Sequence, residues 1–187
     1  AYLVLTPIAI RVMGGEFYGL WMVLFAVGQL TIIGTLGIES IVNKFAAEVN
    51  ETRNADANIL SSALVVVTGM ALIVAVTLFC LRGFLAERID PSPAHLLQFR
   101  DALAVYSLAI IPQFAIRVFH GFFLAQIMNR FVRTMDLLNS LLPLLGGVMI
   151  SLFYKNLVLL ALWNLCVSLL VLGVYIAKTR QLTGWRW

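Results

Sequence analysis

Long apolar runs alternate with short polar segments along the chain, at a spacing that suits helices crossing a bilayer. The runs cover residues 1–12, 17–38, 59–81, 102–128, 137–154 and 156–177. About 20 predominantly apolar residues allow a helix to cross a hydrocarbon core of about 30 Å. The pattern therefore predicts an all-α integral membrane protein in which residues 1–187 form a single bundle of about six transmembrane helices.

The first apolar run is shorter than a membrane span. The segment AYLVLTPIAI provides about ten residues before Arg11, whereas a spanning helix needs about 20. A signal peptide would carry a basic segment ahead of its apolar region, and none precedes this run. We therefore expect a truncated first helix and a chain that is a fragment of a longer protein.

The second apolar run contains a predicted helix break. Gly34 and Gly37 lie near its end, and each weakens a helix by roughly 1 kcal/mol relative to Ala. Glu39 follows directly, beside backbone that could line a cavity if it unwinds. The residues on one face beyond it are Ile41, Val42, Phe45 and Val49. This spacing predicts that the helix continues to residue 50 as an amphipathic helix at the membrane surface.

Polar segments separate the remaining runs. Residues 51–58 have the Asn and Asp content of a helix cap and turn. Residues 82–100 form the longest predicted connection, because Pro91 and Pro93 cannot sit inside a continuous helix. In the fifth run, Pro143 and the Gly146-Gly147 pair predict a kink or a close-packing site.

Composition supports membrane integration and excludes several functions. Hydrophobic residues make up 61% of the chain and charged residues 12%, where soluble domains average roughly 25% charged. The basic residues behind the net charge of +4 are scattered singly, unlike the clustered face of a nucleic-acid binder. Cys80 and Cys166 lie inside apolar runs and are expected to be buried thiols. Motifs for nucleotide, metal or covalent catalysis are absent from the sequence, which predicts no enzyme, metal site or cofactor.

The fourth run carries the main candidate site. Pro112 interrupts it, and Gln113, Arg117 and His120 follow at i, i+4 and i+7, on one helical face. An arginine near the centre of a span costs about 2.5–3.5 kcal/mol. Arg117 is 13 residues before Arg130, about 20 Å at helical rise, so snorkelling fits poorly. Two interpretations stay open: contact with an anionic substrate such as a diphosphate, or a permanent ion pair.

The other candidate site residues also have both a functional and a structural interpretation. Glu39 could pair with Lys44 or Arg117, couple to a proton, or be a plain interfacial acid. Arg11 could face a central cavity or anchor the first helix at the interface. Gln113 and His120 could contact a ligand or serve as satisfied polar packing residues.

The string RVMGGEFYGLW from Arg11, followed by GTLGIESIVNKFAAE, resembles the start of Wzx-type polysaccharide flippases. These belong to the MOP superfamily, which also contains MATE exporters and lipid II flippases. The places that carry the resemblance are Arg11, Gly15, Tyr18, Gly19, Gly37, Lys44 and Glu48. Members of this family usually have an acidic residue before the Leu-Gly pair. In this chain Thr35 occupies that place, and Glu39 lies nearby.

The resemblance implies the N-terminal bundle of a two-bundle transporter in a prokaryotic cytoplasmic membrane, whose C-terminal bundle is missing here. Such a transporter moves lipid-linked oligosaccharide, on a polyprenyl diphosphate, to the outer leaflet by alternating access. Arg11 and Arg117 would face its cavity, and an ion gradient or the membrane potential would replace ATP. The alternatives are a MATE-like exporter of cations and a non-transporting membrane subunit.

Overall fold

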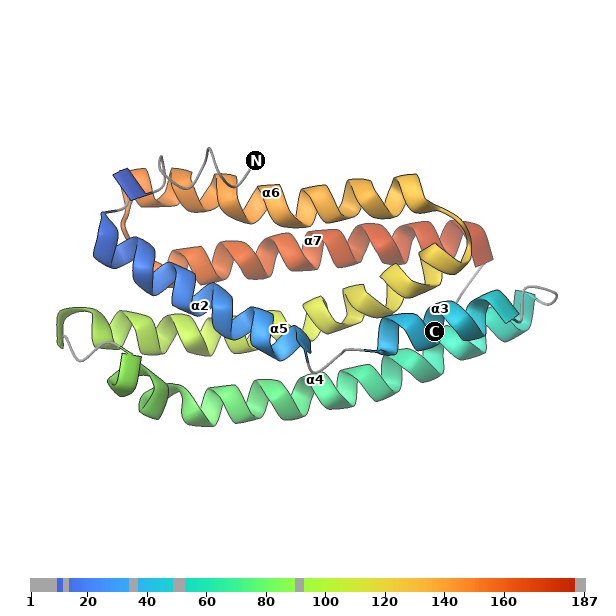
Figure 1. Ribbon diagram of the computed structural model, residues 1–187, viewed down its shortest axis with the longest axis horizontal. Helices are drawn as coiled ribbons and strands as arrows, with labels where there is room; N and C mark the ends of the chain where they lie inside the picture. Colours follow the sequence, from blue (N-terminus) through green and yellow to red (C-terminus); the bar gives the residue numbers. More distant parts are fainter. Residues whose placement is uncertain (1–9, 12–13, 34–36, 49–52, 90–92, 184–187) are drawn as a thin grey trace.

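The computed structural model describes residues 10–11, 14–33, 37–48, 53–89 and 93–183. The helices in these ranges are α2 (Gly15–Ile33), α3 (Ile38–Glu48), α4 (Arg53–Ile89), α5 (Pro93–Ala125), α6 (Asn129–Phe153) and α7 (Leu157–Thr183). Figure 1 shows an elongated bundle whose helices run along its long axis. The predicted all-α helical bundle is confirmed.

Four of these helices are long and apolar enough to cross a membrane: α4, α5, α6 and α7. The chain is therefore a membrane protein, and these four helices correspond to the last four of the predicted spans. The predicted first span lies almost entirely outside the described residues. The predicted second span, residues 17–38, corresponds to α2, and its predicted continuation to residue 50 corresponds to α3, which follows α2 along the bundle (Figure 1).

Two predicted connections prove to be helical. Residues 53–58 form the first turns of α4, and residues 82–89 form its last turns, so that only 90–92 separate α4 from α5. Proline is accepted at the first helical position because its missing N–H would have no partner there anyway. Pro93 therefore begins α5, although the sequence interpretation used it to extend a loop.

The predicted break between α2 and α3 is present at Gly37, while Gly34 lies outside the described residues. Gly37 has φ +105°, a left-handed conformation that glycine adopts at little cost. Helix α3 runs lengthwise against α4 and α5 (Figure 1), and its place at the membrane surface stays a prediction. Its buried face is Val42 with Ala46, one turn apart, and the larger Phe45 is exposed.

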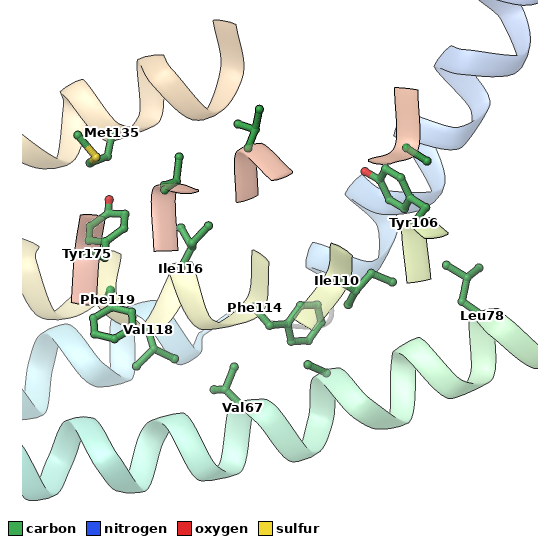
Figure 2. Close-up of a cluster of buried hydrophobic side chains, with 14 of the residues drawn as sticks. Val67, Leu78, Tyr106, Ile110, Phe114, Ile116, Val118, Phe119, Met135 and Tyr175 are labelled. Atoms are coloured by element: carbon green, nitrogen blue, oxygen red, sulfur yellow. The ribbon is translucent and has the colours of Figure 1, made fainter. Parts of the chain in front are cut away.

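Helix α5 is the centre of the bundle. In the most apolar stretch of α5, 61% of the residues are buried. In the corresponding stretches of α4, α6 and α7 the buried share is 22–33%. Helix α5 packs mainly against α4, α7 and α3, and Figure 2 shows its side chains Ile110, Phe114 and Phe119 inside the core. A helix shielded from lipid on most sides can carry polar residues that an outer helix cannot.

Pro112 does not end α5, contrary to the predicted helix break. The helix continues through it to Ala125, and Figure 1 shows the second half of α5 turned relative to the first. A proline inside a helix removes one backbone hydrogen bond and bends the axis without necessarily ending it. The two cysteines also differ from expectation, because Cys80 and Cys166 are both free and exposed on the outside of the bundle.

The Gly146-Gly147 pair is a close-packing site, one of the two predicted alternatives. A Cβ on Gly146 would clash with Nε1 of Trp163 on α7, and a Cβ on Gly147 would lie 3.4 Å from the Trp21 ring on α2. The same Trp163 Nε1 donates a hydrogen bond to the Leu142 carbonyl at 2.9 Å. The glycines therefore let α6 approach both neighbouring helices.

Two buried tyrosines on α5 and α7 differ in how their hydroxyls are paired. Tyr175 stacks on Phe119 with ring centroids 6.1 Å apart, and its buried hydroxyl has no hydrogen-bond partner among the described residues. The Tyr106 hydroxyl instead lies near the polar side chains of Gln113 and Asn164. Figure 2 shows both rings inside the core.

We expect Tyr175→Phe to leave the free energy of unfolding unchanged or to raise it by up to about 1 kcal/mol, since it removes an unpaired buried hydroxyl and keeps the ring. Tyr106→Phe should lower the same quantity by about 1 kcal/mol, because Gln113 and Asn164 lose a partner. Reversible unfolding in lipid bicelles measures both. Equal destabilisation by the two variants would contradict this account of the core.

Candidate functional site

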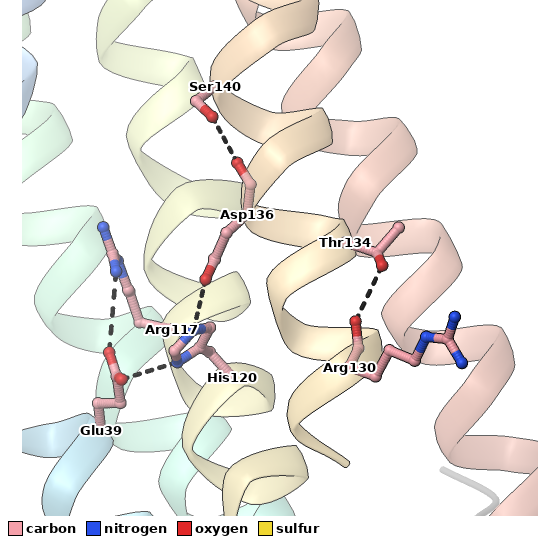
Figure 3. Close-up of polar contacts among 7 residues, drawn as sticks. All are labelled: Glu39, Arg117, His120, Arg130, Thr134, Asp136 and Ser140. Atoms are coloured by element: carbon pink, nitrogen blue, oxygen red, sulfur yellow. Dashed lines mark hydrogen bonds and ion pairs between the residues drawn. The ribbon is translucent and has the colours of Figure 1, made fainter. Parts of the chain in front are cut away.

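A chain of four ionisable side chains links three helices (Figure 3). Arg117 Nη1 lies 3.8 Å from Glu39 Oε2. The other oxygen of Glu39, Oε1, lies 2.7 Å from His120 Nδ1. The opposite ring nitrogen, Nε2, lies 3.2 Å from Asp136 Oδ2. We call Glu39, Arg117, His120 and Asp136 the ionic network.

Local structure places each member of the ionic network. Arg117 and His120 are three residues apart on α5 and so share a face. Glu39 is in the first turn of α3, two residues after the left-handed Gly37. Asp136 is in the second turn of α6.

Gly121 allows α3 to approach α5 closely at the network. A Cβ on Gly121 would lie 2.5 Å from the carbonyl oxygen of Glu39 and 3.2 Å from its Cα. Both atoms belong to the α3 backbone, so a larger residue here could be accommodated only by moving the helix. Gly121 therefore sets the distance at which Glu39 reaches His120.

The network is partly shielded, and its charges balance. The His120 side chain is 12% exposed and Glu39 32%, whereas Asp136 is 56% exposed. With His120 protonated, two cations face two carboxylates and the net charge is zero. Because both ring nitrogens of His120 face carboxylate oxygens, both contacts are favourable only when each nitrogen carries a proton.

The two carboxylates contact opposite sides of one imidazole and do not converge on a common point. Within the described residues no group of three His, Cys, Asp or Glu side chains has the arrangement of a metal site. The arrangement instead suits proton binding and the exchange of ion-pair partners.

The depth assigned to Arg117 from the sequence was too great. The prediction treated residues 102–128 as one span, but α5 ends at Ala125, which is eight residues past Arg117. That corresponds to about 12 Å of helix instead of about 20 Å. In the structure Arg117 contacts Glu39, and both interpretations of Arg117 allow this contact.

The remaining predicted residues do not join the network. Gln113 lies between α5 and α7, with its Nε2 3.5 Å from the Ser168 hydroxyl. Arg11 is exposed and precedes α2, whose far end leads to α3. The structure thus unites three of the five candidates, Glu39, Arg117 and His120, and separates Gln113 and Arg11 from them.

Sequence reasoning missed Asp136 and Gly121. Asp136 was overlooked because the fifth apolar run was taken to begin at residue 137, whereas α6 begins at Asn129. A helix drawn back to Asn129 would have placed an acid inside a membrane segment, which is a functional signal in itself. Gly121 follows His120 directly, but its close contact with Glu39 depends on tertiary packing.

Neither a model of a known protein family, nor a curated protein, nor a solved structure matches the chain. The site is therefore interpreted from its own geometry.

We expect Gly121→Ala to lower the free energy of unfolding by about 1–3 kcal/mol, because the added methyl group meets the α3 backbone. The matched control is Gly69→Ala in α4, where a Cβ would have no neighbour within 4 Å. That change should be neutral or stabilising by up to about 1 kcal/mol. Unfolding of both variants in bicelles measures the difference. If Gly121→Ala behaved like Gly69→Ala, the close approach of α3 would be refuted.

Proposed function

We propose that the chain is part of a membrane transporter that moves a lipid-linked oligosaccharide by alternating access, with the ionic network as the part that exchanges partners. The observation that supports it most directly is the position of the network. It joins α3, α5 and α6 beside the discontinuity between α2 and α3. In transporters, discontinuous helices and ionisable residues within the membrane occur where substrates and coupling ions bind.

Arg117 has the properties of a switchable contact. Its distance of 3.8 Å from Glu39 is long for an ion pair, and 36% of its side chain is exposed. A phosphate oxygen of a lipid diphosphate could replace the Glu39 carboxylate at Arg117, exchanging one anion for another at the guanidinium. Substrate binding would then release Glu39, and with it α3.

The substrate class is supported by the resemblance between residues 11 and 48 and the polysaccharide flippases, because the geometry alone favours any anionic headgroup. We propose on the same ground a prokaryotic cytoplasmic membrane, a C-terminal bundle as partner and a polyprenyl diphosphate carrier. Surrounding lipid is a partner of the exposed apolar helix faces in any case.

The charge balance disfavours the MATE-like alternative. An exporter of cations needs uncompensated carboxylates in its cavity, and the two acids of the network already face Arg117 and His120. The alternative of a non-transporting membrane subunit competes more strongly with the transporter proposal, because Arg117 would also be paired in such a subunit. In a subunit the pair between Arg117 and Glu39 would be permanent, whereas in a transporter it would open when substrate binds.

We expect Arg117→Ala to abolish glycan export while leaving the amount of protein in the membrane near normal, since the cation that meets the diphosphate is lost. The control is Arg133→Ala, which removes an exposed arginine outside the network and should leave export intact. Export is measured as surface glycan in cells that depend on the variant, and abundance by quantitative immunoblotting. Normal export in Arg117→Ala would overturn the proposal, and loss of protein together with export would favour the subunit.

A further inference from the structure

A neutral His120 side chain cannot donate a hydrogen bond to both of its carboxylate neighbours. One ring nitrogen lies 2.7 Å from a Glu39 oxygen and the other lies 3.2 Å from an Asp136 oxygen. An ionised carboxylate only accepts hydrogen bonds, and a neutral imidazole has a single N–H. With both acids ionised, a neutral His120 would direct a nitrogen lone pair at one of them.

We propose that His120 is the binding site for one proton, and that this proton holds α6 against α5 through Asp136. When the proton is bound, Nε2 donates a hydrogen bond to Asp136, and the N–H at Nδ1 lies in ion-pair contact with Glu39. When it leaves to water, a single N–H remains and one of the two contacts turns repulsive.

The contact that is lost on deprotonation is the one with Asp136. Glu39 is closer to the ring, and Arg117 holds its second oxygen. Asp136 is farther from the ring, and its side chain is 56% exposed, so water can take the place of His120 as its partner.

Helix α6 makes few contacts with α5 besides this one, the clearest being that between Phe131 and Phe123, whose ring centroids are 5.0 Å apart. It packs mainly against α7, where the Gly146 and Trp163 contact lies. That contact is ten residues beyond Asp136 along α6, or about 15 Å of helix. Release of Asp136 would remove the ionic contact from the first half of α6 and leave that half held by apolar packing alone, chiefly by Phe131 against Phe123 and Tyr175.

No other described group competes for the role of His120. Its ionisable neighbours are Glu39 from α3 and Asp136 from α6, with Arg117 on the same helix beyond Glu39. The Tyr175 hydroxyl of α7 lies within electrostatic range of the two acids and of Arg117. The described parts of α2 and α4 contribute no ionisable group that acts on His120.

The test is a distance measurement by electron paramagnetic resonance on the whole chain in lipid nanodiscs. Cys80 and Cys166 are first replaced by Ser, and spin labels are attached at Ile73→Cys on α4 and Leu137→Cys on α6, both exposed positions. From about pH 5 to about pH 9, the interval in which histidines commonly titrate, the distance distribution should shift to longer values. The ratio of the two populations should change about tenfold per pH unit in the steep part, as one proton requires.

Matched variants identify the group that binds the proton. The chain contains two histidines, so His120→Gln should abolish the pH dependence and His95→Gln should retain it. In Asp136→Asn the side-chain amide can donate to a neutral His120, so the short distance should persist at every pH. This variant keeps the proposal testable if His120→Gln does not fold.

The proposal would be overturned if the distance distribution of the labelled chain with all four network residues intact did not change with pH. It would also be overturned by a transition that survives in His120→Gln, or by a transition in Asp136→Asn like that of the starting chain. The experiment contains no transport substrate, so its result does not depend on the proposed function. If the position of α6 depended on pH but the protein did not export glycan, the proton-binding proposal would hold and only the proposed flippase function would be refuted.

Discussion

The cost of placing an ion within a bilayer is the constraint on which this structure depends. Arg117 on the central helix must be compensated, and Glu39 compensates it from α3. Because Glu39 also contacts His120, and His120 contacts Asp136, one requirement for charge neutrality connects α3, α5 and α6. These helices are otherwise held by apolar packing, which in lipid has little directional preference. The polar contacts therefore fix how α3 and α6 are placed against α5.

The backbone is shaped to make these contacts possible. Gly37 turns the chain between α2 and α3 with φ +105° and directs the first turn of α3 at α5. Gly121 lacks the Cβ that would meet the Glu39 carbonyl at 2.5 Å. Neighbouring helices bury most of the apolar length of α5, and His120 on its charged face is 12% exposed. Two glycines and one shielded helix thus allow four ionisable residues to persist in a membrane-spanning bundle.

Apolar run length was enough to predict the helical class, the membrane environment and the break at Gly37, because these depend on local composition. Helix ends were predicted poorly, since α4 and α5 extend through polar residues, and Pro93 begins a helix instead of preventing one. The spacing on α5 indicated Arg117 and His120, and Glu39 was one of the partners considered. Asp136 could not be found in this way, because its contact with His120 depends on how α6 folds back along α5.

The most direct test of this account is a double-mutant cycle between Glu39 and His120, using Glu39→Gln, His120→Gln and the double variant, with the free energy of unfolding in bicelles as the readout. If the two side chains form a shared ionic network across α3 and α5, the single changes will not add. Their coupling should be about 1 kcal/mol or more, within the usual range for contacting charged groups. A coupling of about zero would mean that the two residues do not stabilise one another, and the network would not be what holds these helices together.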